Sequence, residues 1–133
     1  MKSIEIGEIK IGPSEPPFII AEMSANHNGN IENAFKIIDK AKECGASAVK
    51  MQPYTADTIT LKSDSDDFKI KGGLWDGKTL YDLYEEAHTP WHWHKELFDL
   101  AKAEGLICFS TPFDISAVDF LEELNCPIYK IAS

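Results

Sequence analysis

Phe18-Ile19-Ile20-Ala21-Glu22, a short apolar run that ends in a carboxylate, is the stretch that decides the fold of this 133-residue chain. An Asn- and Gly-rich loop over residues 23–30 follows it, and apolar residues then recur at helical spacing over residues 31–41. The helical pattern ends at Gly45, and a second apolar run begins a few residues later at Ala48. This order predicts a strand, a helix and a second, parallel strand.

The same alternation continues to the end of the sequence. Ile107-Cys108-Phe109 and Ile128-Tyr129-Lys130-Ile131 are further short apolar runs, and helical patterns cover residues 91–104 and 115–124. Strands buried on both faces of a parallel sheet read as continuous apolar runs. The sequence therefore predicts an α/β fold with about four parallel strands and three helices over residues 18–133, preceded by a β-hairpin over residues 1–13.

A partial (β/α)₈ barrel fits this pattern better than an open nucleotide-binding sheet. The loop after the first apolar run contains neither GxGxxG nor GxxxxGK[ST]. A complete barrel takes about 250 residues, so four strands correspond to half of one. We expect both edges of such a half-sheet to favour self-association or to require a missing remainder of the polypeptide.

Residues 53–90 form a long connection with one short helical pattern over 79–87. Connections of this length in compact domains commonly act as substrate loops or lids. A plain surface insertion is the alternative.

Composition narrows the functional classes. A net charge of −9, with no run of Lys or Arg, argues against binding to nucleic acid. No apolar stretch approaches a membrane span, and we expect a cytoplasmic protein. Cys44, Cys108 and Cys126 show no CxxC spacing, and we predict that all three are small buried apolar residues.

The polar residues at the ends of the apolar runs are the candidate site. Ligands bind beyond the carboxyl ends of parallel strands, so these residues are expected to meet at one rim. They bring a carboxylate, two ammonium groups and several hydroxyls together: Glu22, Lys50, Ser110, Thr111, Lys130 and Ser133.

Four motifs over residues 18–29, 48–52, 109–114 and 129–133 resemble the amino-terminal half of the sialic acid synthase family. The stretch over residues 71–91 resembles the pseudaminic acid synthase branch of that family. The resemblance implies condensation of phosphoenolpyruvate with an open-chain acetamido sugar, 2,4-diacetamido-2,4,6-trideoxy-L-altrose in this branch, with release of phosphate. It also implies a homodimer.

The resemblance also implies roles for single residues. Two compact cations and two hydroxyls suit the carboxylate and phosphate of phosphoenolpyruvate. The phosphoenolpyruvate-binding residues are expected to be Lys50, Thr111, Lys130 and Ser133. Glu22 is the expected acid–base carboxylate, and the expected sugar-binding residues are Asn26, Gln52 and Trp75.

The family uses a divalent metal, manganese or magnesium, and its ligands are expected to lie outside this chain. His88, His92 and His94 are not expected to form a metal site, because positions 92 and 94 point to different faces. The resemblance implies that complete members carry a second half-barrel and a carboxy-terminal antifreeze-like domain, which we do not expect these 133 residues to supply. We therefore expect the isolated chain to be inactive.

Three alternatives stay open. The sugar preference could be that of an N-acetylneuraminate or legionaminate synthase. The chain could instead be a noncatalytic module in which half-barrels pair. A Schiff-base aldolase on Lys50 or Lys130 is the third reading.

Overall fold

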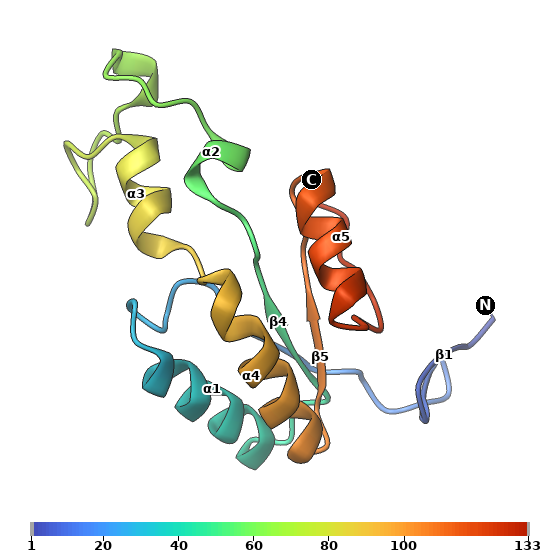
Figure 1. The fold of residues 1–133 in the computed structure, drawn as a ribbon. Helices are drawn as coiled ribbons and strands as arrows, with labels where there is room; N and C mark the ends of the chain where they lie inside the picture. Colours follow the sequence, from blue (N-terminus) through green and yellow to red (C-terminus); the bar gives the residue numbers. More distant parts are fainter. Residues whose placement is uncertain (1, 133) are drawn as a thin grey trace.

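The structure, a computed structural model, describes residues 2–132 and contains two small sheets and five α-helices. Figure 1 follows the elements along the chain. Their bounds are β1 (Ile4–Ile6), β2 (Ile9–Ile11), β3 (Ile20–Glu22), α1 (Ile31–Glu43), β4 (Ala48–Met51), α2 (Ala56–Ile59), the 3₁₀ helix η1 (Asp66–Phe68), α3 (Leu80–Ala87), α4 (Trp91–Ala103), β5 (Ile107–Ser110) and α5 (Ile115–Glu123).

The main sheet has the order β3-β4-β5, and both strand pairs are parallel. Glu22 is the register partner of Lys50, which in turn lies opposite Phe109. Backbone hydrogen bonds extend the pairing beyond the strands, from Met23 N–H to the Lys50 carbonyl and from Thr111 N–H to the Met51 carbonyl, at 3.1 Å each. The polar strand ends are therefore held side by side by backbone geometry.

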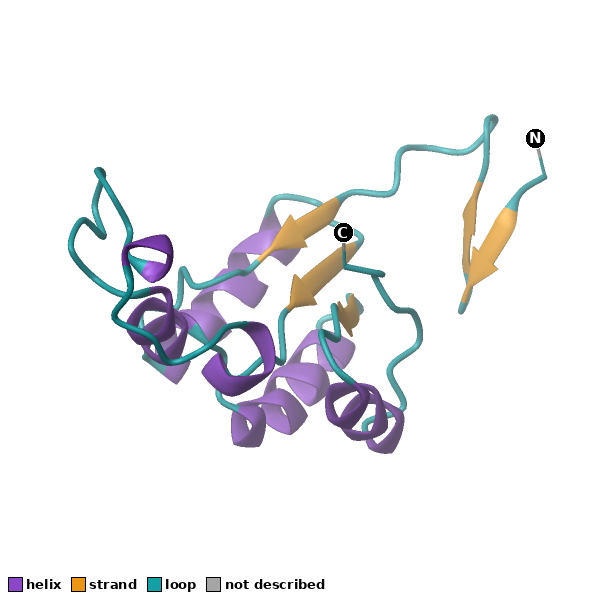
Figure 2. Ribbon diagram, turned by 90° about the horizontal axis from the view of Figure 1, so that it is seen from above, coloured by secondary structure: helices purple, strands orange, loops and turns teal. Residues whose placement is uncertain are grey.

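Helices cover only one face of this sheet, as the view in Figure 2 shows. Side chains alternate between the two faces of a strand. Those of Val49, Met51 and Cys108 point toward the helices and join the core with Ile38 of α1 and Leu97 of α4. The opposite face, called the inner face below, lies toward the hairpin.

The sequence specifies α1 at both of its ends. The Asn30 side chain accepts a hydrogen bond from Glu32 N–H at 2.8 Å, which caps the amino terminus. At the carboxyl end Gly45 adopts a φ of +81°, and Ala46 N–H donates to the Ala41 carbonyl. The predicted hairpin is confirmed as β1 and β2, which pair antiparallel through a turn at Gly7 and Glu8.

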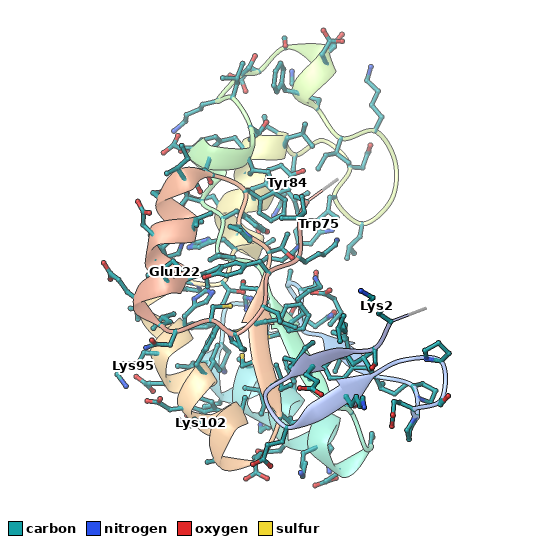
Figure 3. The ribbon with its side chains drawn as sticks, turned by 90° about the vertical axis from the view of Figure 1, so that its right-hand side faces the viewer. Lys2, Trp75, Tyr84, Lys95, Lys102 and Glu122 are labelled. Carbon is teal, nitrogen blue, oxygen red and sulfur yellow. The ribbon has the colours of Figure 1, made fainter. Side chains whose placement is uncertain are left out.

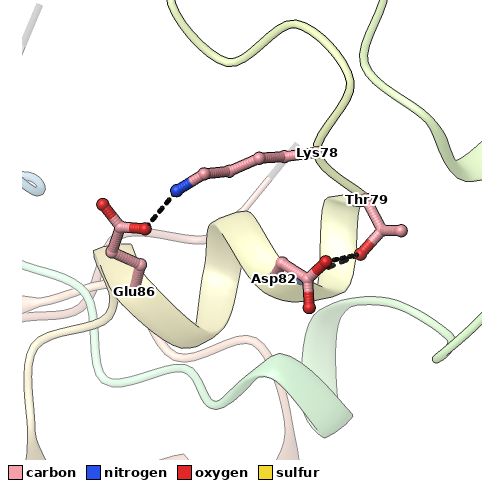
Figure 4. Close-up of polar contacts among 4 residues, drawn as sticks. All are labelled: Lys78, Thr79, Asp82 and Glu86. Atoms are coloured by element: carbon pink, nitrogen blue, oxygen red, sulfur yellow. Dashed lines mark hydrogen bonds and ion pairs between the residues drawn. The ribbon is translucent and has the colours of Figure 1, made fainter.

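The 53–90 connection is more ordered than the sequence pattern predicts, because it contains α2 and η1 as well as α3. Thr79 caps α3 by accepting a hydrogen bond from Asp82 N–H at 3.1 Å, and its hydroxyl donates to the Asp82 carboxylate at 2.8 Å. Lys78, which precedes α3, forms an ion pair with Glu86 in the last turn of that helix (Figure 4). Local polar contacts of this kind are invisible to hydrophobic periodicity.

Two strand predictions need correction. The run Ile128–Ile131 forms no strand; it makes one parallel bridge, between Tyr129 and Ser110, with Lys130 N–H donating to the Ser110 carbonyl at 3.2 Å. The first strand is not buried on both faces, since Ile20 is 45% exposed. Both segments lie at sheet edges, where no further strand within residues 2–132 covers them or completes their pairing.

The cysteine prediction is correct for Cys108, which is buried, and wrong for Cys44, which is exposed because it caps α1 on its solvent side. Cys126 is half-buried, and burial raises its pKa. Over residues 2–132, no helix is both long and apolar enough to cross a membrane.

Candidate functional site

The candidate site is a hollow of about 530 Å³ on the inner face of the sheet. Three of its polar lining residues are ones that the sequence predicts, Glu22, Lys50 and Lys130. The remaining lining is apolar or aromatic, from the hairpin, the strands and the carboxy-terminal segment: Ile6, Ile11, Phe18, Ile20, Phe109, Ile128 and Tyr129. A largely apolar hollow with a few converging charges is typical of a small-molecule site.

Glu22 and Lys50 lie at the centre of this arrangement as a direct ion pair. Strand alternation and the β3–β4 register bring both side chains to the inner face. The Lys50 side chain is only 9% exposed, whereas that of Glu22 is 44% exposed. A buried ammonium requires a counter-charge, and Glu22 supplies it.

The carboxy-terminal segment brings the second cation to the hollow. The backbone of Lys130 is fixed on Ser110, while its side chain is exposed. The adjacent Tyr129 donates its hydroxyl proton to Glu122 of α5, and burial together with this bond raises the pKa of the Tyr129 hydroxyl. Tyr129 thus stays protonated at neutral pH and ties the segment to α5.

Thr111 occupies a different position from these three residues. It follows β5 directly and is 1% exposed, but it does not line the hollow. Its hydroxyl oxygen is buried and has no hydrogen-bond partner within residues 2–132. The predicted grouping of Glu22, Lys50, Thr111 and Lys130 is thus seen for three members.

The predicted sugar-binding residues do not line the hollow either. The Asn26 side-chain amide donates to the Met23 carbonyl at 3.0 Å, within its own loop. Gln52 follows β4 directly and is half-buried. The Trp75 ring belongs to the 53–90 connection, and Lys78 Nζ lies 4.8 Å from its centroid. In Figure 3, Trp75 lies above Lys2, which precedes the hairpin. Ser133 lies outside the described residues.

No group of three His, Cys, Asp or Glu side chains in the described part of the chain is placed to hold a metal ion. His94 is fully buried, its Nδ1 lies 3.2 Å from the Pro90 carbonyl, and burial lowers its pKa to about 4. His88 Nδ1 lies 2.7 Å from the Glu85 carbonyl. Both histidines are thus engaged with backbone carbonyls.

Sequence reasoning missed the aromatic part of the lining. Phe109 is the register partner of Lys50, and Tyr129 precedes Lys130. The signal for Phe109 was available in the period-2 alternation of β5, which places it on the opposite face from Cys108. Nothing in the sequence pattern indicated that Ile6 and Ile11 of the hairpin would line the same hollow.

Comparison with known proteins adds a family to this geometry. The model of the NeuB family matches residues 37–133. A pseudaminic acid synthase of Campylobacter jejuni is 55% identical over 116 residues, which are 87% of this chain and 34% of that protein. A pseudaminic acid synthase of Helicobacter pylori is 51% identical over 119 residues, 90% of this chain and 35% of that protein.

A solved structure has the same architecture. The N-acetylneuraminic acid synthetase of Leptospira borgpetersenii, in complex with citrate, superposes with a TM-score of 0.80 at 28% identity. The match covers 98% of this chain and 41% of that one. The chain thus spans about a third of the length of the curated relatives it matches.

Proposed function

The chain belongs to the NeuB family, and from that premise we propose that it forms the phosphoenolpyruvate side of a nonulosonic acid synthase. The three-stranded sheet is, in this proposal, a portion of a (β/α)₈ barrel, and the hollow is a portion of the barrel mouth. The pseudaminic branch is supported by the identity of 51–55% with two synthases of that name. A legionaminate or N-acetylneuraminate synthase is the alternative within the same family.

One observation carries the proposal: two lysines from separate segments and one carboxylate line the same hollow. Phosphoenolpyruvate carries a carboxylate and a phosphate, and Lys50 and Lys130 offer one compact cation for each. Lys50 is the stronger anchor because it is nearly buried, and a low local dielectric strengthens its attraction for an anion. The net charge of −9 repels an anionic ligand at long range, and the two lysines outweigh this repulsion only close to the hollow.

The residues then account for the reaction as follows. The enol carbon C3 of phosphoenolpyruvate forms a bond to the sugar aldehyde carbon, and the aldehyde oxygen takes a proton to become a hydroxyl. Water adds at C2, and loss of inorganic phosphate leaves the 2-keto acid. An anion that binds Lys50 displaces Glu22, whose carboxylate then becomes available to accept the proton from the attacking water.

Thr111 and Ser133 would donate hydrogen bonds to the bound phosphoenolpyruvate. The Thr111 hydroxyl is buried and has no hydrogen-bond partner among residues 2–132, which supports its part, because such a group gains most from a ligand that bonds it. Asn26, Gln52 and Trp75 would contact the sugar, with the 53–90 connection on the substrate side. A manganese or magnesium ion would polarise the aldehyde, and the described residues do not fit such a site. Its ligands are therefore proposed to lie outside this chain.

Calorimetric titration of the chain with phosphoenolpyruvate tests the proposal. Lys50→Met keeps the stem and removes the charge, so its affinity should fall by about tenfold or more, because a charge-assisted bond contributes about 1.5–3 kcal/mol. Lys102→Met is the matched control, since Lys102 lies on α4 outside the hollow (Figure 3). Equal affinities for the three proteins, or no binding by any, would contradict the proposal.

We also propose that the isolated chain binds but does not catalyse. A condensation assay with phosphoenolpyruvate, the altrose sugar and manganese should give no phosphate release. Turnover by the 133-residue chain would contradict this part of the proposal.

The open sheet edges favour a second candidate function, a noncatalytic module in which two half-barrels associate as a homodimer. Ile19 and Ile20 at the β3 edge are 52% and 45% exposed. A closed dimer in size-exclusion chromatography with light scattering, combined with no affinity for phosphoenolpyruvate, would favour this module over the synthase.

A further inference from the structure

His27 stands out among the groups that the proposed chemistry does not use. It lies in the loop between β3 and α1, five residues after Glu22, and its side chain is completely buried. Gly29 N–H donates to its Nδ1 at 3.1 Å, and its Nε2 lies 3.1 Å from the hydroxyl oxygen of Thr89. Because Nδ1 accepts, the neutral ring carries its proton on Nε2 and donates it to Thr89.

The surroundings hold this ring in one orientation. The His27 ring meets the Trp93 ring edge to face, with centroids 5.3 Å apart. The backbone carbonyl of His27 accepts hydrogen bonds from the Asn30 N–H and the Asn33 side-chain amide. Burial lowers the pKa of His27, and the nearby His88 lowers it further. At neutral pH the ring is therefore uncharged and both of its nitrogens are bonded.

Thr89 is the exit of the 53–90 connection, and it is 2% exposed. Two residues later, the Trp91 indole N–H donates to the carbonyl of Pro53, the entry of the same connection, at 3.0 Å. The two ends of the connection are thus joined by a hydrogen bond, and its carboxy-terminal end is also hydrogen-bonded to the loop that follows Glu22. The start of the connection also contacts the β5–α5 loop, because the Tyr54 and Phe113 rings meet edge to face with centroids 5.8 Å apart.

We propose that His27 is a positioning residue which, through Thr89, fixes the 53–90 connection over the carboxyl ends of β3 and β4. The inference rests on the proposed function for its purpose, because the connection is the substrate-side element of that proposal. Its physical content is independent: one hydrogen bond between side chains 62 residues apart couples two loops at the same rim. Loss of that bond should loosen the connection and leave the core between sheet and helices intact.

Amide hydrogen exchange of the whole chain, followed by mass spectrometry, tests this coupling. Thr89→Val keeps the shape and removes the hydroxyl, and amides in residues 53–90 should exchange about tenfold faster, as expected for one buried hydrogen bond. Thr89→Ser keeps the hydroxyl and should exchange like the wild type. Amides of α1, β4 and α4 should stay within about twofold in both variants.

His27→Asn provides the second variant, since its side-chain oxygen stays near Gly29 but its amide is too short to reach Thr89. It should accelerate exchange of the same segment, and combination with Thr89→Val should add nothing further. His92→Gln is the control, because His92 is an exposed histidine on α4, the helix that carries Trp93. Unchanged exchange over 53–90 in both Thr89→Val and His27→Asn, or an even increase over the whole chain, would overturn the inference.

Titration of the wild type with phosphoenolpyruvate keeps the two ideas separate. Absent binding refutes the proposed function and leaves the exchange result as the test of the coupling.

Discussion

The two faces of the β3-β4-β5 sheet are built from alternate residues of the same strands, yet they have opposite properties. The face toward the helices is apolar and closed, because Val49 and Met51 of β4 are completely buried in one core with Leu97 of α4. The inner face carries the Glu22–Lys50 pair above a hollow and is open along the β3 edge. One strand can thus supply stability with one set of side chains and binding with the next.

The largest effect is expected on the closed face. Leu97→Ala removes a fully buried side chain from α4 and should lower the free energy of unfolding by about 2–5 kcal/mol, since it leaves a cavity. Leu74→Ala, at a side chain that is 90% exposed, should change it by less than about 0.5 kcal/mol. Urea denaturation measures both. Similar small changes for the two variants would show that the helix side of the sheet is loosely packed.

Acid should destabilise the fold through His94, which is completely buried on α4 with its ring against Phe120 of α5. Its pKa is about 4 in the fold against 6.5 for an unperturbed side chain, so below pH 6.5 the unfolded chain binds the proton first. Stability attributable to His94 is therefore complete above pH 6.5, falls by about 2 kcal/mol on going to pH 5, and levels off below pH 4. Urea titrations at pH 7.5 and pH 5 should show a smaller loss for His94→Asn than for the wild type. An equal loss in His94→Asn, or a reduced one in the exposed control His92→Gln, would refute this assignment.

The inner face should respond asymmetrically to removal of either member of its ion pair. Glu22→Gln leaves the nearly buried Lys50 without a counter-charge and should cost about 1–2 kcal/mol of stability, less than for a fully buried pair because Glu22 is partly hydrated. Lys50→Met leaves only the half-exposed Glu22 and should cost under about 1 kcal/mol. Phosphoenolpyruvate should stabilise Glu22→Gln more than the wild type, because no carboxylate competes for Lys50. Thermal and urea unfolding measure both losses. An equal loss of unfolding free energy in Glu22→Gln and Lys50→Met would contradict this asymmetry.

Thiol reactivity gives the smallest and most local contrast. Cys44 is exposed, whereas burial raises the pKa of Cys108 on the closed face. A disulfide reagent at pH 8 should therefore modify Cys44 within minutes and Cys108 only after denaturant is added. Cys44→Ser, with no effect on stability beyond about 0.5 kcal/mol, should abolish the fast phase. Fast modification of Cys108 would mean that the closed face opens readily.

The sequence predicts the elements that depend on local periodicity and caps. The α1 helix ends before Gly45 as expected, β5 forms within one residue of its predicted bounds, and the hairpin forms inside the predicted residues 1–13. The failures are positions where tertiary context decides. Residues 128–131 have the composition of a strand, but within the described residues they pair only with β5, through a single bridge between Tyr129 and Ser110.

In the candidate site, too, positions set by strand register could be predicted, whereas positions set by loop packing could not. Glu22 and Lys50 could be placed together because the ends of parallel strands share a rim, and their register makes them neighbours. Thr111 is at the predicted rim, but its hydroxyl does not line the hollow. Burial of a hydroxyl depends on how the loops pack above it, which residue spacing does not encode.

A crystal structure of the chain with bound phosphoenolpyruvate would show whether the inner-face hollow is the binding site. We expect the ligand in the inner-face hollow, with the ammonium groups of Lys50 and Lys130 within hydrogen-bond distance of its carboxylate or phosphate and Glu22 released from Lys50. A ligand bound away from the hollow, or the two lysines on opposite sides of the sheet, would contradict it.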